Sequence, residues 1–304
     1  MKQKNIEGII TNIIQKHMNF CPIKAQRCAV GQGNYVYIVE CPSDKYVLRL
    51  SEEKDAYKDT VYWLERLADL EIPVPKVLAK GHMETFEYIL LTYFEGKDIG
   101  LVYTELTEEE KRNIAREIVA VQKKMEELKL ENVPINWSWK TEIEKMLERS
   151  KMRIAQNGYF DTAKVDRLYK LGKELDSYFA GIKPIAYLDD VSTKNLLVHN
   201  GHVSGIVDID WMEMGDKLTY VALTNMALLN MNCNTDYVKY ILEEMQLTPI
   251  QKKAFHFYTL MCCVDFMGER GMQFMDKKIE VNESIIKRLN ELYDKLIQEW
   301  KQKM

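Results

Sequence analysis

The sequence contains no long hydrophobic run: nowhere do apolar residues continue without a charge for the roughly 18 positions that a membrane-spanning helix needs. It also lacks an excess of charge of one sign. The 42 lysines and arginines nearly balance the 46 aspartates and glutamates, which leaves a net charge of −4. This balance disfavours a protein that coats nucleic acid or an anionic membrane. We therefore expect no nucleic acid, no membrane and no obligate protein partner.

Cysteines are few and are not arranged as metal ligands. Six occur in 304 residues, and none forms a C-x-x-C pair with a second Cys/His cluster at zinc spacing. The N-terminal segment MKQKNIEGIITNIIQKHM has apolar residues at helical spacing and no small-residue cleavage site. It predicts an amphipathic helix rather than a signal peptide. Free thiols without a targeting segment lead us to expect a cytoplasmic protein.

The order of the predicted elements divides the chain into two lobes. Residues 1–95 are rich in strands: YVYIVEC and KYVLRL, joined by turn residues, predict a hairpin, and EYILLTYF predicts a buried strand. Residues 96–304 are mainly helical, with capping boxes that begin at Thr107 and Thr248 and one hairpin that turns at Asn200-Gly201. A small β-rich N-terminal lobe followed by a larger helical lobe predicts an α+β, bilobal protein-kinase-like fold.

The sequence YLDDVSTKNLLVHNGHVSGIVDIDWMEMGD, residues 187–216, places six acids around this hairpin. Asp190 and Asn195 have the spacing of a kinase catalytic loop, in which the Asp accepts the hydroxyl proton and the Asn binds metal. Asp208 follows the second hairpin strand, where a carboxylate can hold Mg²⁺ against nucleotide phosphates. Asp210, on the same side of the strand, is the alternative metal ligand, and we favour Asp208. The alternative is that Asp190, Asn195 and Asp208 belong to a solvated polar loop with no catalytic or metal-binding role.

Two segments resemble the aminoglycoside phosphotransferase family. The run NGHVSGIVDIDWMEMGD resembles the core of this family, and most closely that of hygromycin phosphotransferases. The run YVLRLSEEKDAYKDTVYWLERLADLEIPVPKVLAKG resembles the family's third strand, the helix after it and the connection to the next strand. The resemblance extends in order from about residue 31 to residue 216. It implies a kinase that phosphorylates a small molecule with ATP or GTP.

The resemblance also assigns roles to individual residues. It makes Asp190 the catalytic base, and Asn195 and Asp208 the ligands of Mg²⁺. It makes Arg49 the strand cation that contacts the nucleotide phosphates, held by Asp59 on the next helix. Taken by itself, Arg49 has the alternative of an exposed cation paired with Glu52 or Glu53. Further nucleotide-binding positions are Gly31, Gly33 and Asn34 in the loop over the phosphates, and Thr92 and Phe94 beside the adenine.

The acceptor is expected to bind in the helical lobe. A cationic amino sugar, such as an aminoglycoside, would contact acids there, and the candidates are Glu213, Asp216, Asp265 and Glu269. A metabolic acceptor such as choline or a methylthio-sugar is the alternative. A solvated or structural charge is the other explanation for each of the four acids.

The chain departs from the family at two positions. Leu188 stands where the family usually has His, two residues before Asp190, and Tyr220 stands where it often has an acid after the Gly-Asp pair. The first departure raises the alternative of a catalytically inactive nucleotide-binding scaffold. A protein kinase is disfavoured, because no D-F-G motif and no A-P-E-bounded activation loop follow Asp208.

Overall fold

The computed structural model describes residues 6–28, 35–131, 133–210, 212–274 and 277–302. The chain forms two compact units. The first comprises residues 1–96 and 204–211, and the second comprises residues 97–203 and 212–304. In the described part of the chain, no helix is both long enough and apolar enough to cross a membrane.

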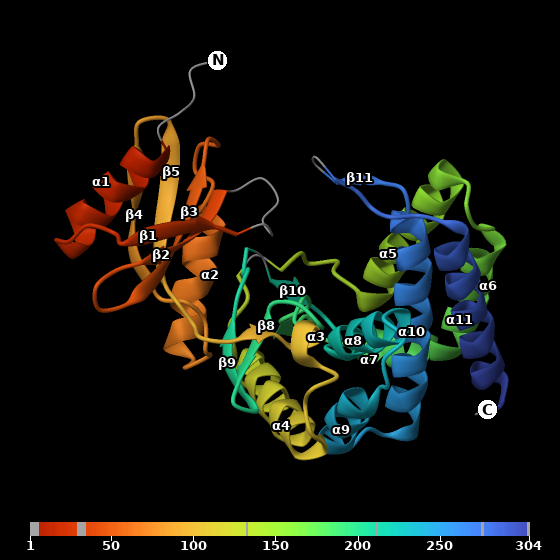
Figure 1. Ribbon diagram of the computed structural model, residues 1–304. Helices are drawn as coiled ribbons and strands as arrows, with labels where there is room; N and C mark the ends of the chain where they lie inside the picture. The colour runs from red at the N-terminus through yellow and green to blue at the C-terminus, as the bar shows by residue number, and fades with distance from the viewer. Residues whose placement is uncertain (1–5, 29–34, 132, 211, 275–276, 303–304) are drawn as a thin grey trace. The chain divides into compact units, whose positions relative to one another are not determined.

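The first unit contains a five-stranded antiparallel sheet in the order β1-β2-β3-β5-β4 (Figure 1). The predicted hairpin is confirmed, since β2 pairs with β3 so that Val36 lies opposite Arg49. The predicted buried strand is confirmed as β5, which pairs with both β3 and β4. The strands are β1 (Lys24–Arg27), β2 (Tyr35–Glu40), β3 (Lys45–Ser51), β4 (Val77–Met83) and β5 (Phe86–Thr92).

Helices α1 (Ile6–Met18) and α2 (Lys58–Asp69) lie on opposite sides of this sheet (Figure 1). The isoleucines of α1 pack with Leu48 and Leu50 of β3 in one apolar cluster, which confirms the predicted amphipathic N-terminal helix. Because side chains alternate along a strand, Arg49 points to the other face, the face of α2. The alternation of β3 thus separates the apolar core from the cationic position.

The second unit is mainly helical. Most of its helices, but not that of residues 108–124, contribute to an apolar core that includes Trp139, Phe179 and Tyr258. Both predicted capping boxes are present, at Thr107 and at Thr248. The helices are α3 (Ile99–Val102), α4 (Glu108–Lys124), α5 (Trp139–Asn157), α6 (Ala163–Gly172), α7 (Asp176–Gly181), α8 (Leu218–Asn230), α9 (Asp236–Met245), α10 (Pro249–Glu269) and α11 (Glu283–Gln302), with 3-10 turns η1 (Met125–Glu127) and η2 (Lys173–Leu175).

The acid-rich sequence of residues 187–216 forms several short strands. The predicted hairpin forms from β8 and β9, and Asn200 and Gly201 at its turn both have positive φ, as a tight hairpin turn requires. The strands are β6 (Lys97–Asp98), β7 (Ala186–Tyr187), β8 (Leu196–His199), β9 (His202–Ile206), β10 (Glu213–Met214), β11 (Gln273–Phe274) and β12 (Lys277–Lys278). A small β-rich N-terminal part and a larger helical part confirm the predicted α+β fold class.

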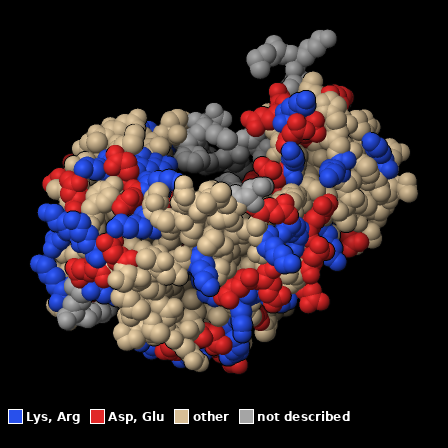
Figure 2. Space-filling view, turned by 180° about the vertical axis from the view of Figure 1, so that it is seen from behind, with Lys and Arg blue, Asp and Glu red and all other residues tan. Residues whose placement is uncertain are grey.

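Positive and negative side chains are intermingled on the face that Figure 2 shows. This distribution agrees with the near balance of acids and bases in the sequence.

Candidate active site

The first unit holds a buried cation, Arg49, at the centre of β3. Arg49 is only 8% exposed, and its two terminal nitrogens donate to the two carboxylate oxygens of Asp210 at 3.0 and 2.9 Å. Thr60 of α2 donates from its hydroxyl to Asp210 Oδ1 at 2.7 Å. Asp208 Oδ1 lies 3.8 Å from Arg49 Nη1. A bidentate pair of this kind fixes the orientation of the guanidinium group as well as its charge environment.

The segment 204–211 brings these two acids to the sheet. The amide of Ile206 donates to the carbonyl oxygen of Pro73 at 2.7 Å. Gly205 packs so closely on Phe94 that a Cβ atom would lie 2.4 Å from the ring, which only glycine permits. The domain boundaries predicted from the sequence assigned this segment to the helical lobe. Its hydrogen bonds and packing join it to the first unit instead.

The two acids differ in their electrostatics. Burial by itself raises the pKa of Asp210, but the hydrogen bonds and charge of Arg49 outweigh it and hold the pKa below its ordinary value. The pKa of Asp208 is raised, because nearby protein displaces part of the water around its carboxylate and Asp210 adds repulsion that Arg49 only partly offsets. The Asp208 side chain is nevertheless 61% exposed. Asp210 is therefore engaged by protein donors, whereas Asp208 is accessible to a ligand.

The helix residue in this cluster is Thr60 and not Asp59. Asp59 is exposed in the first turn of α2, and the carboxylate that holds Arg49 comes from the segment after the hairpin. One position along a helix rotates a side chain by about 100°, which turns Thr60 to the sheet and Asp59 to solvent. The alternative of an exposed Arg49 paired with Glu52 or Glu53 is wrong, because Arg49 is buried against the acid just described.

The second unit holds the predicted catalytic loop. Asn195 donates from its side-chain amide to the carbonyl oxygen of Asp190 at 3.1 Å and to its Oδ2 at 3.0 Å. The backbone amide of Asn195 donates to Asp98 Oδ1 at 2.8 Å. Nearby, the amide of Gly100 donates to the carbonyl oxygen of Thr193 at 3.0 Å. The structure thus brings Asp190 and Asn195 into contact and supports them from the start of the unit. Sequence reasoning missed Asp98, whose only signal is that it is an acid just after the predicted boundary between the lobes at residue 95.

Two predicted metal ligands have left-handed backbone conformations. The φ angles are +63° at Asn195 and +61° at Asp208. Asn and Asp adopt this region more readily than other residues with a Cβ atom. Strained conformations of this kind concentrate at functional sites, so both angles agree with a site assignment.

The nucleotide-binding positions have separate outcomes. Gly31, Gly33 and Asn34 lie outside the described residues. Thr92 ends β5, and its amide donates to the carbonyl oxygen of Lys76 at 3.0 Å. Phe94 lies beyond the end of β5 and its ring packs on Gly205; its contact with the adenine stays a prediction.

Among the predicted acceptor acids, Asp216 is buried in protein and only 7% exposed. Tyr178 and Tyr258 donate to its Oδ2 at 2.6 and 2.9 Å, and the Leu218 amide donates to its Oδ1 at 3.0 Å. Burial raises its pKa although these hydrogen bonds oppose the shift. The prediction that Asp216 contacts the acceptor is corrected: its oxygens are engaged by the donors that anchor the start of α8.

The turn beside Asp216 is firmly packed although Tyr220 replaces the family's acid. Gly215 has a φ of +136°, and a Cβ atom there would lie 2.2 Å from the ring of Trp139. Trp139 in turn donates from its indole nitrogen to the Tyr258 hydroxyl at 2.7 Å. Tyr220 is fully buried, and its hydroxyl has no hydrogen-bond partner among the described residues. The aromatic packing therefore supports this turn without an acid at position 220.

Glu213 differs from Asp216 because it is only partly buried, on β10. Burial raises its pKa, and the nearby charges of Asp189 and Glu142 raise it further, while Arg149 opposes them. Repulsion of this kind means that a bound cation would stabilise these acids in their charged form. Glu213 therefore stays a predicted acceptor contact, with Arg149 as a cation that is already near it.

The other two acceptor candidates already have protein partners. Asp265 accepts hydrogen bonds from Ser150 Oγ at 3.0 Å and Arg153 Nη1 at 3.3 Å. Glu269 Oε1 lies 3.9 Å from Arg153 Nη1, and burial and the charge of Asp265 raise the pKa of Glu269. Both side chains are roughly a third exposed or less, at 28% and 31%. Arg153 thus supplies a counter-charge that a cationic acceptor would have to share.

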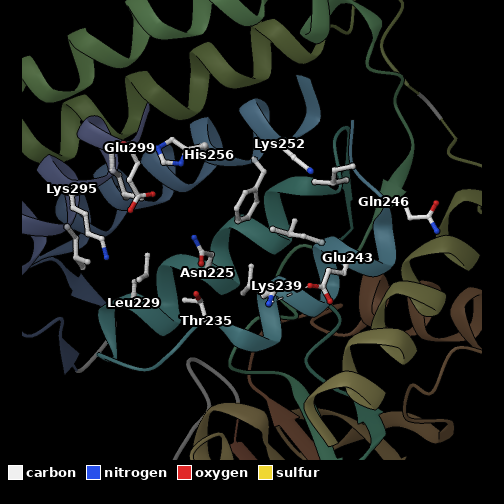
Figure 3. Close-up of a pocket in the computed structure, with 16 residues that line it drawn as sticks. Asn225, Leu229, Thr235, Lys239, Glu243, Gln246, Lys252, His256, Lys295 and Glu299 are labelled. Atoms are coloured by element: carbon white, nitrogen blue, oxygen red, sulfur yellow. Dashed lines mark hydrogen bonds and ion pairs between the residues drawn. The ribbon is translucent and has the colours of Figure 1, made fainter. Parts of the chain in front are cut away.

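A separate cavity of about 540 Å³ lies between helices α8, α9, α10 and α11 of the second unit (Figure 3). Lysines 239, 252 and 295 line it together with apolar side chains. None of the residues predicted for catalysis, nucleotide binding or acceptor binding lines this cavity.

The comparisons with known proteins agree with this fold. Several solved phosphotransferases have the same fold. A thermostable mutant of aminoglycoside phosphotransferase APH(4)-Ia, in a ternary complex with AMP-PNP and hygromycin B, is similar with a TM-score of 0.67 and 15% identity, over 95% of this chain and 98% of that one. ADP-bound APH(2'')-Ib is similar with a TM-score of 0.63 and 15% identity, over 93% and 96% of the two chains. A candidate fructosamine-3-kinase from Haemophilus somnus 129PT is similar with a TM-score of 0.62 and 14% identity, over 96% and 97%.

The family is defined by a sequence model. The model of the phosphotransferase enzyme family (APH) matches residues 24–219, more than half of the chain. The protein therefore belongs to the phosphotransferase enzyme family, as the resemblance implied. No curated protein matches the sequence.

Proposed function

We propose that the protein transfers the γ-phosphoryl group of ATP or GTP to a hydroxyl of a small molecule, with an aminoglycoside or related amino sugar as the leading acceptor class. The observation that carries this proposal is the catalytic loop, in which Asn195 binds both the carbonyl and the carboxylate of Asp190. Family membership supports phosphoryl transfer. The free cysteines support a cytoplasmic setting.

In the proposed reaction Asp190 orients the acceptor hydroxyl and accepts its proton as the hydroxyl attacks the γ-phosphorus in line. Arg49 contacts the nucleotide phosphates, for which its charge and planar donors are suited. No covalent enzyme intermediate is needed.

The residues present are suited to Mg²⁺. The side-chain oxygen of Asn195 and the exposed carboxylate of Asp208, which the family resemblance assigns to the metal, are oxygen donors of the kind that Mg²⁺ prefers. Within the described residues no group of three or more His, Cys, Asp or Glu side chains could hold a metal ion. Mg²⁺ is usually bound by one or two protein ligands together with substrate phosphates and water. Bound there, the ion would neutralise charge on the phosphates.

The acceptor class follows from the acids near the catalytic loop. Burial raises the pKa of Glu213, Asp189 and Glu142 raise it further, and Arg149 opposes them; a protonated amine beside these three acids would add to the favourable charge that Arg149 supplies. A neutral sugar would not. The same reasoning covers other cationic acceptors, including a choline-like amine, and one structural neighbour is a candidate fructosamine-3-kinase.

The test is a phosphorylation assay with purified protein, Mg²⁺, and ATP or GTP. The acceptor panel contains aminoglycosides, a fructosamine, choline and a methylthio-sugar, and product is detected by mass. We expect a phosphorylated amino sugar with wild type and none with Asp190→Asn. Nucleotide binding without any product across the panel would contradict the proposal and favour an inactive scaffold.

A further inference from the structure

Leu188 lies two residues before Asp190, where its apolar side chain cannot hold the loop by hydrogen bonds. The structure shows what holds the backbone there instead. Gln122 of α4 donates from Nε2 to the carbonyl oxygen of Leu188 at 2.7 Å. The amide of Leu188 donates in return to Gln122 Oε1 at 3.0 Å. One side chain thus satisfies both polar backbone groups of Leu188, as a neighbouring strand would.

Gln122 is a polar residue on a helix face that is otherwise largely apolar and buried. The buried face of α4 is formed largely by apolar side chains, among them Ile114, Ile118 and Val121. Gln122 is on this face and is only 1% exposed. A primary amide in such a position is costly unless it is hydrogen-bonded, and the Leu188 backbone satisfies it. A methionine or leucine would fill the same space without that requirement.

The pairing lies at the point where regular structure ends. Tyr187, the residue before Leu188, pairs with Glu213 in the two-stranded ladder of β7 and β10. After Tyr187 the chain leaves this ladder and enters the loop that carries Asp190. On the far side of Asp190, Asn195 holds its carbonyl and carboxylate. The loop is therefore anchored before Asp190 by Gln122 and after it by Asn195.

We infer that Gln122 is a positioning residue of the proposed catalytic loop. By fixing the backbone of Leu188, it determines the position and orientation of Asp190 two residues later. This inference rests on the proposed function, because it assigns Asp190 a reacting hydroxyl to orient. Gln122 itself touches no substrate in this scheme and acts through the Leu188 backbone. It explains how a loop with leucine at position 188 keeps a defined geometry.

The test compares Gln122→Met with Ile118→Ala. Methionine keeps the size of glutamine but makes neither hydrogen bond to Leu188. Ile118→Ala removes buried volume one turn earlier on the same helix, so it destabilises α4 without removing a bond to the loop. Both variants are assayed as full-length protein, well below their unfolding temperatures.

We expect Gln122→Met to lower kcat by about tenfold or more and to leave the KM for nucleotide within about twofold, since misplacing a reacting group affects chemistry more than binding. Ile118→Ala should keep kcat within about twofold of wild type. In hydrogen exchange followed by mass spectrometry, the segment 187–195 should exchange faster in Gln122→Met than in Ile118→Ala.

The two readouts separate failure of the inference from failure of the proposed function. If wild type phosphorylates no acceptor, the proposed function fails, and hydrogen exchange still decides whether Gln122 holds the loop. Equal exchange of residues 187–195 in the two variants would overturn the inference. An unchanged kcat in Gln122→Met, with wild type active, would overturn it as well.

Discussion

Replacing Asp210 with alanine should destabilise the first unit more than replacing any exposed acid near it. The substitution removes both hydrogen bonds to Arg49 and the one from Thr60. It leaves a guanidinium group that is only 8% exposed without its principal counter-charge. Breaking a fully buried ion pair costs about 3–5 kcal/mol.

Two features of the structure reduce this cost. The Asp210 side chain is 30% exposed, so water can partly replace it. Asp208 lies 3.8 Å from Arg49 and supplies a second negative charge. We therefore expect a loss of about 2–3 kcal/mol in the free energy of unfolding of the first unit.

The assay is urea unfolding, with hydrogen exchange of β3 and β5 to report on the first unit separately. Asp59→Ala is the matched control, because Asp59 is an exposed acid next to Thr60. It should change stability by about 0.5 kcal/mol or less. Equal effects of the two substitutions would refute the conclusion that Asp210, and not Asp59, holds Arg49.

Three further predictions concern pH, packing and metal. The pKa of Asp210 is depressed below 3.8, so its contribution to stability is complete above that pH and is lost as the pH falls through its folded value. The stability difference between wild type and Asp210→Ala, measured by urea unfolding, should then shrink with acid, and a constant difference would contradict this. Gly215→Ala should lower the free energy of unfolding, measured by thermal unfolding, by more than about 2 kcal/mol, because a Cβ atom would lie 2.2 Å from Trp139 and φ at this position is +136°. A smaller loss would contradict the conclusion that this turn is firmly packed. Removal of Mg²⁺ with EDTA should abolish phosphoryl transfer, and Asp208→Asn should raise the Mg²⁺ concentration needed for half-maximal rate by about tenfold or more, whereas an unchanged requirement would exclude Asp208 as a ligand.

Local sequence patterns predicted the elements that depend on local physics. The amphipathic N-terminal helix, the first hairpin, both capping boxes and the Asn200-Gly201 turn depend on neighbours within a few residues. The spacing of Asp190 and Asn195 similarly predicted their place in one loop, and they are in contact. These features were accessible because each is encoded within one short segment.

The errors and omissions concern contacts between distant segments. The residue that holds Arg49 is 161 positions away, at Asp210, and it was weighed only as an alternative metal ligand. The sequence makes Asp216 a candidate acceptor contact with a structural charge as the alternative, and the structure supports the alternative, because Tyr178 and Tyr258 from two other helices donate to it. No periodicity within either segment encodes such pairings.

The sequence by itself determined the fold class, the order of the elements and the contact of Asp190 with Asn195 in one loop, because hydrophobic period, turn residues and motif spacing act locally. Only the tertiary structure decided which acid holds Arg49, which carboxylate is buried and which side chain anchors Leu188. Gln122 shows the reason. A glutamine in an apolar helix face signals that a partner is needed, but only the packing of α4 against the loop, 66 residues away in the chain, identifies that partner.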